Sequence, residues 1–486
     1  MNKSSQIDNI RELEKRARFL DPDGEQRGRL LGDVAGYGED FLGSISSAPA
    51  YNDRVDNGRG LLDAPISERG IGIEETLKLF QEDVASVGIN PTSGRFLGYI
   101  PGGGLYYAAL GDYLAALTNR YAGIFYASPG AVRMENLLLR WMADMVGYPE
   151  SAGGNLASGG SIANLTAIVS ARDAQGLEGE RIHRSVVYLT EQTHHCITKA
   201  LRVAGLSGCI QRQVLVDSSY RMHAAALEDC IKSDVQDGLL PWLIVSSSGT
   251  TNTGSVDPLA EIGEIARSYG LWHHVDGAYG AFFALCPEGH QALKGMNQSD
   301  SIVMDPHKTL FLPYGTGAVL VKDRKKMLAA HSADADYMQD AINLEEELDP
   351  AAVSPELTKH FRGLRLWLPL QAVGAAPFRA ALSEKIQLAR YFYDRIQSMD
   401  GFEVGPYPDL SIVIYRYVPS SGDADEFNRR LVEAIQQEGR IFISSTRVDG
   451  KFVLRMAVGC FRTHLEDIDI ALEVIENAAR RLEGEQ

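Results

Sequence analysis

The sequence contains no apolar run close to the ~20 residues that a membrane-spanning helix needs, and it is short of positive charge. Its 486 residues include 47 lysines and arginines against 64 aspartates and glutamates, for a formal net charge of −17. A general nucleic-acid-binding protein would show a basic stripe, and a polybasic membrane anchor needs clustered lysine and arginine. We therefore expect neither nucleic acid nor a membrane among the partners.

Cysteine is also scarce, because the sequence has only five scattered cysteines and no CxxC pair. This pattern argues against a structural zinc site, and we expect no metal. The first residues, MNKSSQIDNIRELEKRARF, are polar and charged, and they lack the apolar core of a secretory signal. A reduced, cytoplasmic protein is the simplest interpretation.

The composition is that of a globular protein, with 45% hydrophobic and 23% charged residues, and the length suggests about three domains. Residues 1–95 show helical patterns. Within residues 96–365, short apolar runs alternate with helical patterns from about residue 129 onward. Residues 366–486 again contain both apolar runs and helical patterns. Strands that alternate with helices predict a large α/β domain with a mainly parallel sheet. The last segment predicts a small α+β domain.

A run of small residues, Ala157-Ser-Gly-Gly-Ser161, precedes a predicted helix. The backbone N–H groups of such a run and the positive end of the helix can bind an anion together, and Ser161 adds a hydroxyl. Taken alone, the run is equally typical of a simple helix cap.

Three further polar segments follow apolar, strand-like runs. His194 follows VVYLT, Asp276 lies in LWHHVDGAYG just after a short apolar run, and Lys308 follows SIVM. Side chains at the carboxyl ends of parallel strands reach the ligand crevice of an α/β sheet. Each residue alone has a simpler interpretation, as a surface histidine, a turn-capping aspartate or a solvated lysine.

The four segments together indicate a more specific site. An anion site, a histidine that stacks on a flat ring, an aspartate beside a protonated ring nitrogen and a lysine that forms a Schiff base are the parts that pyridoxal phosphate (PLP) needs. The sequence therefore predicts PLP as the cofactor.

Six motifs, in this order, resemble those of the PLP-dependent group II amino-acid decarboxylases, and the aromatic-L-amino-acid branch most closely. They are YASPGAVRMEN, SGGSIAN, GTTNTGSVDP, HVDGAYG, DPHK and FRGLRLW. The resemblance runs from about Phe96 to the C-terminus. It implies a carboxy-lyase that converts an L-amino acid, most plausibly an aromatic one, into an amine and carbon dioxide. It also implies the aspartate-aminotransferase-like fold (PLP fold type I) and a homodimer with active sites at the interface, wrapped by the N-terminal segment.

The resemblance implies roles for the residues around the cofactor ring. Lys308 binds the cofactor covalently, and Asp276 pairs with the pyridine nitrogen. His194 stacks on one ring face, the methyl group of Ala278 packs on the other, and Thr251 lies near Asp276 and the ring.

The remaining implied roles concern the phosphate and the reaction. Gly160 and Ser161 bind the phosphate, and His307 binds phosphate or substrate. The segment AHSADADYMQDAI resembles the family's catalytic loop, with Tyr337 at the position of its tyrosine. A phenol placed there can return a proton to the α-carbon after carbon dioxide leaves. The predicted catalytic residues are thus Lys308, Tyr337, His194 and His307.

The family's pocket for the substrate side chain is implied to contain Tyr99, Ile100 and Pro101, with Tyr121 and Phe125 from the partner subunit. Such an aromatic and apolar lining suits a flat apolar side chain.

Alternatives remain open for the substrate and the product. Arg120 lies near this pocket in the sequence and could pair with the carboxylate of an acidic substrate such as aspartate or glutamate. A decarboxylating aldehyde synthase on the same scaffold is another alternative, although phenylalanine replaces the loop tyrosine in such relatives. A binding protein without activity would be expected to lack the lysine or the aspartate, and both are present.

Overall fold

The protein, described here by a computed structural model, forms two compact units, residues 1–90 and 91–486. The structure describes residues 3–52, 58–332 and 347–484. No helix within these ranges is both long and apolar enough to cross a bilayer. The domain boundaries expected near residues 95 and 365 stay predictions.

The first unit is mainly helical. It contains α1 (Lys3–Ala17), α2 (Gly24–Ser44), α3 (Gly60–Asp63) and α4 (Ile73–Phe80), and the short strands β1 (Tyr51–Asn52) and β2 (Gly88–Ile89) pair antiparallel. A reciprocal capping box starts α2, because Asp23 accepts from the backbone of Gln26 and the Gln26 side chain accepts from the backbone of Asp23.

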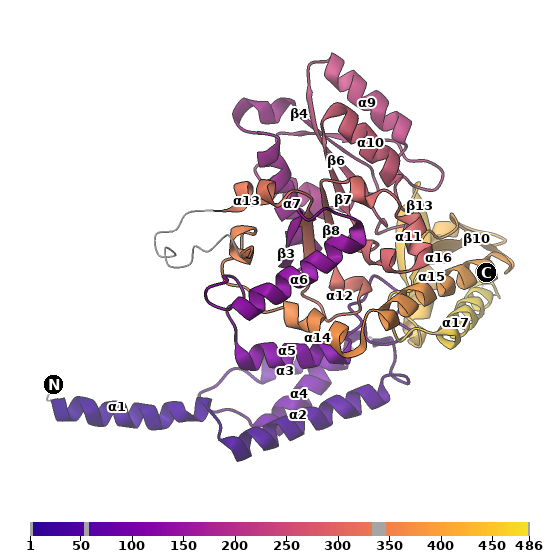
Figure 1. The fold of residues 1–486 in the computed structure, drawn as a ribbon. Coiled ribbons are helices and arrows are strands. Elements are labelled where there is room, and N and C mark those ends of the chain that lie inside the picture. The colour runs from indigo at the N-terminus through magenta and orange to yellow at the C-terminus, as the bar shows by residue number, and fades with distance from the viewer. Residues whose placement is uncertain (1–2, 53–57, 333–346, 485–486) are drawn as a thin grey trace. The chain divides into compact units, whose positions relative to one another are not determined.

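The second unit is built around a seven-stranded sheet with the order β3-β9-β8-β7-β6-β4-β5 (Figure 1). Strands β8, β7, β6, β4 and β5 are parallel, whereas β9 runs antiparallel to both of its neighbours. The predicted α/β class with a mainly parallel sheet is therefore confirmed. The strands are β3 (Gly153–Ala157), β4 (Ser185–Leu189), β5 (Ile210–Gln213), β6 (Leu240–Ser247), β7 (Trp272–Asp276), β8 (Ser301–Met304) and β9 (Gly317–Val321).

Both faces of this sheet are buried. Along β8, Ile302 packs into one apolar core and its neighbour Val303 packs into another, and Leu320 and Val319 on β9 divide in the same way. Successive side chains of a strand point to opposite faces, so the two cores lie on opposite sides of the sheet. This explains why the strands appear in the sequence as continuous apolar runs rather than as alternating patterns.

The helices around this sheet end where the sequence provides stop signals. For example, α6 begins with Pro129 at its first turn and ends at Gly147, which has a φ of 83° that favours glycine. The α-helices of this part are α5 (Tyr106–Thr118), α6 (Pro129–Val146), α7 (Gly160–Ala174), α8 (Cys196–Val203), α9 (Ala224–Gln236), α10 (Leu259–Tyr269), α11 (Pro287–Ala292), α12 (Pro306–Thr309), α13 (Arg324–His331), α14 (Gly363–Val373) and α15 (Ala376–Gln397).

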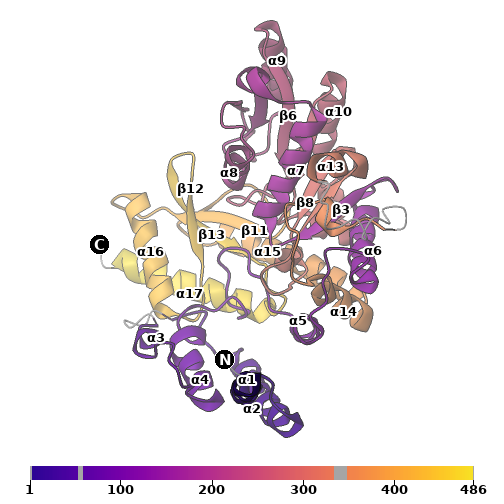
Figure 2. The ribbon, with the colours of Figure 1, turned by 90° about the vertical axis from the view of Figure 1, so that its left-hand side faces the viewer.

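A smaller, antiparallel sheet follows near the C-terminus, with the order β10-β11-β13-β12. Helices α16 and α17 pack beside it (Figure 2). This α+β arrangement agrees with the pattern expected of the last segment. The elements are β10 (Phe402–Val404), β11 (Ile412–Tyr417), α16 (Ala424–Glu438), β12 (Ser444–Val448), β13 (Lys451–Ala457) and α17 (Leu465–Gly484).

A buried ion pair holds β3, the strand that leads into α7. Lys359 Nζ lies 2.5 Å from Glu135 Oε1 and 2.7 Å from Asn155 Oδ1, and the N–H of Leu156 donates to the same Glu135 oxygen. Removing one partner of a buried pair is typically destabilising by about 3–5 kcal/mol. The pair therefore fixes the strand that presents the glycine-rich turn before α7.

Candidate active site

The predicted cofactor residues lie around one cavity of about 210 Å³ at the carboxyl ends of the parallel strands. β4 leads to His194, β6 to Thr251, β7 ends at Asp276, and β8 leads to Lys308. All eight predicted cofactor residues line the cavity, namely Gly160, Ser161, His194, Thr251, Asp276, Ala278, His307 and Lys308. Segments that are far apart in the sequence thus meet at one edge of the sheet, as expected for an α/β fold.

The N-terminus of α7 forms one end of the cavity. Gly160 begins this helix of 15 residues, and its N–H donates to Asp305 Oδ2 at 3.1 Å. A Cβ atom on Gly160 would lie 2.8 Å from that oxygen and 3.3 Å from the Ala278 Cβ, so only glycine leaves this space open. Space of this kind at the positive end of a helix suits a phosphate group.

Asp276 lies at the end of β7 and is only 9% exposed. Its Oδ1 accepts from the N–H of Ala278 at 3.2 Å, and its Oδ2 accepts from Asn164 Nδ2 at 3.4 Å. The thiol of Cys196 lies 4.0 Å from the same Oδ2. A buried carboxylate needs such donors, and an aspartate in this position can hold the proton of a pyridine nitrogen.

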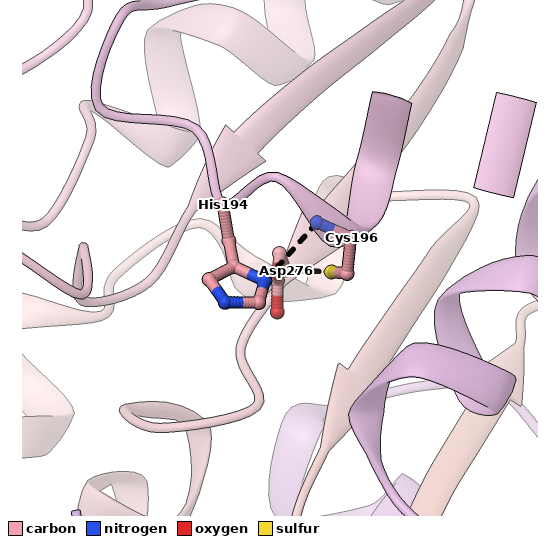
Figure 3. Close-up of side chains that lie close together, drawn as sticks. All are labelled: His194, Cys196 and Asp276. Carbon is pink, nitrogen blue, oxygen red and sulfur yellow. Dashed lines mark hydrogen bonds between the residues drawn. The ribbon is translucent and has the colours of Figure 1, made fainter. Parts of the chain in front are cut away.

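His194 lies beside this carboxylate, with a ring nitrogen within 4.8 Å of a carboxylate oxygen (Figure 3). Its Nδ1 accepts from the N–H of Cys196 at 3.3 Å, which leaves Nε2 with the ring proton. Burial lowers the pKa of His194, although the charge of Asp276 acts in the opposite direction. The imidazole is therefore neutral at pH 7 and can present a flat face to a ring.

His194, Cys196 and Asp276 are close enough together to bind a metal ion. All three side chains also line the cavity that contains the predicted cofactor residues. We therefore interpret this cluster as part of the wall of a cofactor cavity.

Lys308 reaches the cavity from α12. Burial acts to lower the pKa of Lys308, but the charges of Asp305 and Asp276 and a hydrogen bond to Asp305 outweigh it and raise the pKa above its usual value. Nζ lies 3.3 Å from Asp305 Oδ2. The side chain is thus a cation held between two carboxylates, at the place where an amine can meet an aldehyde.

His307 lies beside Lys308, with its ring orientation fixed by the backbone. Its Nδ1 donates to the carbonyl of Thr316 at 2.7 Å, so that Nε2 is left as an acceptor. Burial lowers the pKa of His307, and the ring is neutral at pH 7.

The predicted substrate residues do not line this cavity within one chain. Tyr99 is exposed, whereas Pro101 is buried. Tyr121 Oη donates to the carbonyl of Leu357, and the Phe125 ring lies under the guanidinium of Arg133. Tyr337 lies outside the residues that the structure describes.

Two side chains that contact Asp276 escaped the sequence analysis. Asn164 lies one helical turn beyond Ser161, and Cys196 lies two residues beyond His194. The position of Asn164 on the face of α7 that bears the turn is a signal that could have revealed it. Arg455 also escaped notice: it is 4% exposed, donates from Nε to the carbonyl of Thr251, and comes from a distant strand, so only the tertiary structure reveals it.

The donor set fits PLP: an open helix terminus for phosphate, a buried aspartate for the ring nitrogen, a neutral histidine for the ring face and a lysine for the aldehyde. Residues 72–418 match the family model of the pyridoxal-dependent decarboxylase conserved domain. The chain belongs to this family. It is accordingly a PLP-dependent carboxy-lyase, and the enzyme class and cofactor predicted from the sequence are confirmed.

Relatives with known names cover most of the chain. An aromatic-L-amino-acid decarboxylase from Bacillus atrophaeus is 32% identical, over 88% of this chain and 90% of its own. A phenylacetaldehyde synthase from Arabidopsis thaliana is 30% identical, over 80% of this chain and 82% of its own. The crystal structure of Oryza sativa TDC with PLP and tryptamine has a TM-score of 0.89 and 27% identity, and the match covers 95% of this chain and 99% of that one. The decarboxylase therefore has PLP fold type I, as predicted.

Replacing Gly160 by alanine should weaken PLP binding. The added methyl group would crowd Asp305 and Ala278, and overpacking of this kind costs about 1–3 kcal/mol, or about tenfold in the dissociation constant. Titration of the apoprotein with PLP, followed by absorbance, measures the change. Gly130→Ala is the matched control, because a Cβ there meets no atom within 4 Å. Equal affinities of the two variants would contradict the assigned position of the phosphate.

Proposed function

We propose that this decarboxylase converts an aromatic L-amino acid into the corresponding amine and carbon dioxide. The observation that carries the proposal is the conjunction of Lys308, Asp276 and the α7 terminus around one cavity. The names of the relatives support the aromatic substrate, since they include aromatic-L-amino-acid, tryptophan and tyrosine decarboxylases.

The proposed chemistry assigns one task to each side chain. When bound, PLP supplies a ring that accepts the electron pair left at the α-carbon. Asp276 keeps a proton at the ring nitrogen, because its carboxylate is buried and already oriented by Ala278 and Asn164. Lys308 anchors the cofactor and exchanges with the substrate amine.

The remaining tasks concern position and solvent. The neutral ring of His194 covers one face of the cofactor, and the methyl group of Ala278 covers the other. Gly160 and Ser161 bind the phosphate at the start of α7, where the partial charge of the helix favours an anion. His307, whose Nε2 is left as an acceptor, orients a phosphate or substrate proton.

We propose that Tyr99, Ile100 and Pro101 form part of the pocket for the substrate side chain. Their aromatic and apolar character favours a flat apolar group over a charged one. An acidic substrate, whose side-chain carboxylate would pair with Arg120, is the second candidate. The exposure of Arg120 weighs against it, because an arginine that selects a carboxylate is normally held in a pocket.

We propose amine rather than aldehyde as the product. The support is Tyr337 in the sequence, where a phenol can return a proton to the α-carbon. The similarity to a phenylacetaldehyde synthase keeps the aldehyde as the alternative product.

We propose a homodimer with the active sites at its interface, including Tyr121 and Phe125 of the partner subunit. The support is an apolar set of exposed side chains on α5, which a second copy would cover. These are Tyr106, Tyr107, Leu110, Tyr113, Leu114 and Leu117.

We propose that the enzyme works in the cytoplasm. The support is that all five cysteines are free thiols, as is usual in a reducing compartment. Cell fractionation tests this assignment.

A panel of amino acids tests the proposed reaction. Tryptophan, tyrosine and phenylalanine should release carbon dioxide and amine, and aspartate and glutamate should release little. Lys308→Ala should abolish turnover and the cofactor adduct fixed by borohydride, whereas Lys322→Ala, which removes a lysine bonded to the carbonyl of Asn297, should retain both. Faster turnover of glutamate or aspartate would favour the acidic alternative, and an active Lys308→Ala would refute the mechanism.

Tyr337→Phe should divert the product from amine to aldehyde. The variant keeps the ring but has no phenolic proton to return, so dioxygen takes up the electron pair. One amino acid, one dioxygen and one water then give aldehyde, carbon dioxide, ammonia and hydrogen peroxide. Amine, aldehyde and peroxide are measured together under air, with Tyr391→Phe as the control, because Tyr391 donates to Asp469 on α17 and does not line the cavity. Wild-type amine formation without aldehyde would show that another group donates the proton.

Sedimentation should show the active enzyme as a dimer. Leu117→Glu, which places a charge on the most exposed of the apolar α5 residues, should shift the protein toward monomer and lower its activity in parallel. A fully active monomer would contradict an active site shared between subunits.

A further inference from the structure

A chain of buried polar groups lies behind Asp276 and extends away from the cavity. Trp272 Nε1 lies 2.9 Å from Ser301 Oγ, and Ser301 Oγ lies 2.8 Å from His274 Nδ1. His274 Nε2 lies 2.7 Å from Asn164 Oδ1, and Asn164 Nδ2 lies 3.4 Å from Asp276 Oδ2. The first four residues are each at most 2% exposed. The chain joins β7, β8 and α7.

The direction of every hydrogen bond in this chain follows from its first member. An indole N–H is only a donor, so Ser301 Oγ must accept from Trp272. Among the described residues, the only other polar partner of Ser301 Oγ is His274 Nδ1, so the hydroxyl proton goes there. His274 then carries its proton on Nε2 and donates it to Asn164 Oδ1.

This direction fixes the side-chain amide of Asn164. Because Oδ1 faces His274, Nδ2 faces Asp276 and donates to its carboxylate. In the opposite tautomer of His274, the amide would turn over and place its oxygen against the carboxylate. A donor would thus be replaced by a repulsive contact, at a buried site where such contacts are costly.

His274 must be neutral for this arrangement to hold. Burial lowers the pKa of His274 to about 4, although the charge of Asp276 and a backbone group of Ser301 act in the opposite direction. The ring therefore has one proton near neutral pH, and the contacts with Ser301 Oγ and with Asn164 Oδ1 together favour Nε2 as its position.

We propose that His274 is a positioning residue for the cofactor: as its Nε2–H tautomer, it orients Asn164 so that the amide donates to Asp276 and keeps this carboxylate aligned for the pyridine nitrogen. This rests on the proposed pairing of Asp276 with that nitrogen. Trp272 belongs to the same chain, because it selects the tautomer of His274 through one intervening group, Ser301.

The test compares two identical substitutions on one strand. His274→Phe removes the donor to Asn164. His273→Phe is the matched control, because His273 is equally buried but bonds Ser246 instead. Protein is loaded with PLP labelled with ¹⁵N in the ring, and the ¹⁵N signal reports whether the nitrogen is protonated. The dissociation constant of PLP is measured in parallel.

His274→Phe should shift the ring nitrogen toward its unprotonated form and raise the dissociation constant about tenfold, the scale of one hydrogen bond to a charged group. His273→Phe should resemble the wild type in both measurements. His274→Gln, whose amide can still donate to Asn164, should recover much of the loss. It also serves as the informative variant if His274→Phe fails to fold.

Trp272→Phe tests whether the far end of the hydrogen-bond chain affects the ring nitrogen. It should shift the ¹⁵N signal in the same direction by a smaller amount, and it should add nothing in a His274→Phe background, because the two act through one chain. Trp242→Phe is its control, since Trp242 is buried to the same extent outside this chain.

The outcomes distinguish a failure of the proposed role of Asp276 from a failure of the positioning role of His274. A wild-type protein whose ring nitrogen is unprotonated would refute the proposed role of Asp276 itself. A protonated nitrogen in the wild type, with His274→Phe and His273→Phe indistinguishable, would overturn the positioning role alone. Independent effects of Trp272→Phe and His274→Phe would overturn the selection of the tautomer by the indole.

Discussion

The buried carboxylate of Asp276 is the constraint on which the rest of the site depends. A carboxylate removed from water is costly unless donors surround it, and β7 lies in the interior of a sheet whose two faces are both covered. On the side away from the cavity, water therefore cannot supply those donors. The protein supplies them instead from the backbone of Ala278 and from Asn164 on α7, so the position of α7 against the sheet is part of the chemistry.

The same burial sets the balance of charge in the cavity. Lys308 lies between Asp305 and Asp276, and these two carboxylates raise its pKa despite burial. A phosphate adds further negative charge, which the start of α7 can offset. Asp305 is itself held by the N–H of Gly160. Lys308, the start of α7 and the end of β7 are thus coupled through two aspartates, and a change at one affects the others.

Residues next to one another in the sequence made much of this site predictable. SIVM became β8 with the same bounds, and Asp276 and Lys308 follow their strands as parallel topology requires. The partners of Asp276 were harder to predict, because Asn164 and His274 are 110 residues apart and no local pattern links them. The substrate residues stay predictions for a related reason: Tyr99 and Tyr121 do not line the cavity within one chain, and no local pattern shows which groups they face.

A motif therefore identifies groups that are expected to touch the cofactor, but not the groups hydrogen-bonded behind them. HVDGAYG contains Asp276, yet the chain of hydrogen bonds that reaches it begins at an indole outside the motif. Trp272 can act in this way because its indole N–H can donate a hydrogen bond but cannot accept one. Each later group in the chain is then left with one acceptor for its own proton. A chain of groups that can each donate or accept would be ambiguous. One member that can only donate removes the ambiguity, and the contacts between β7, β8 and α7 carry this direction as far as the carboxylate of Asp276.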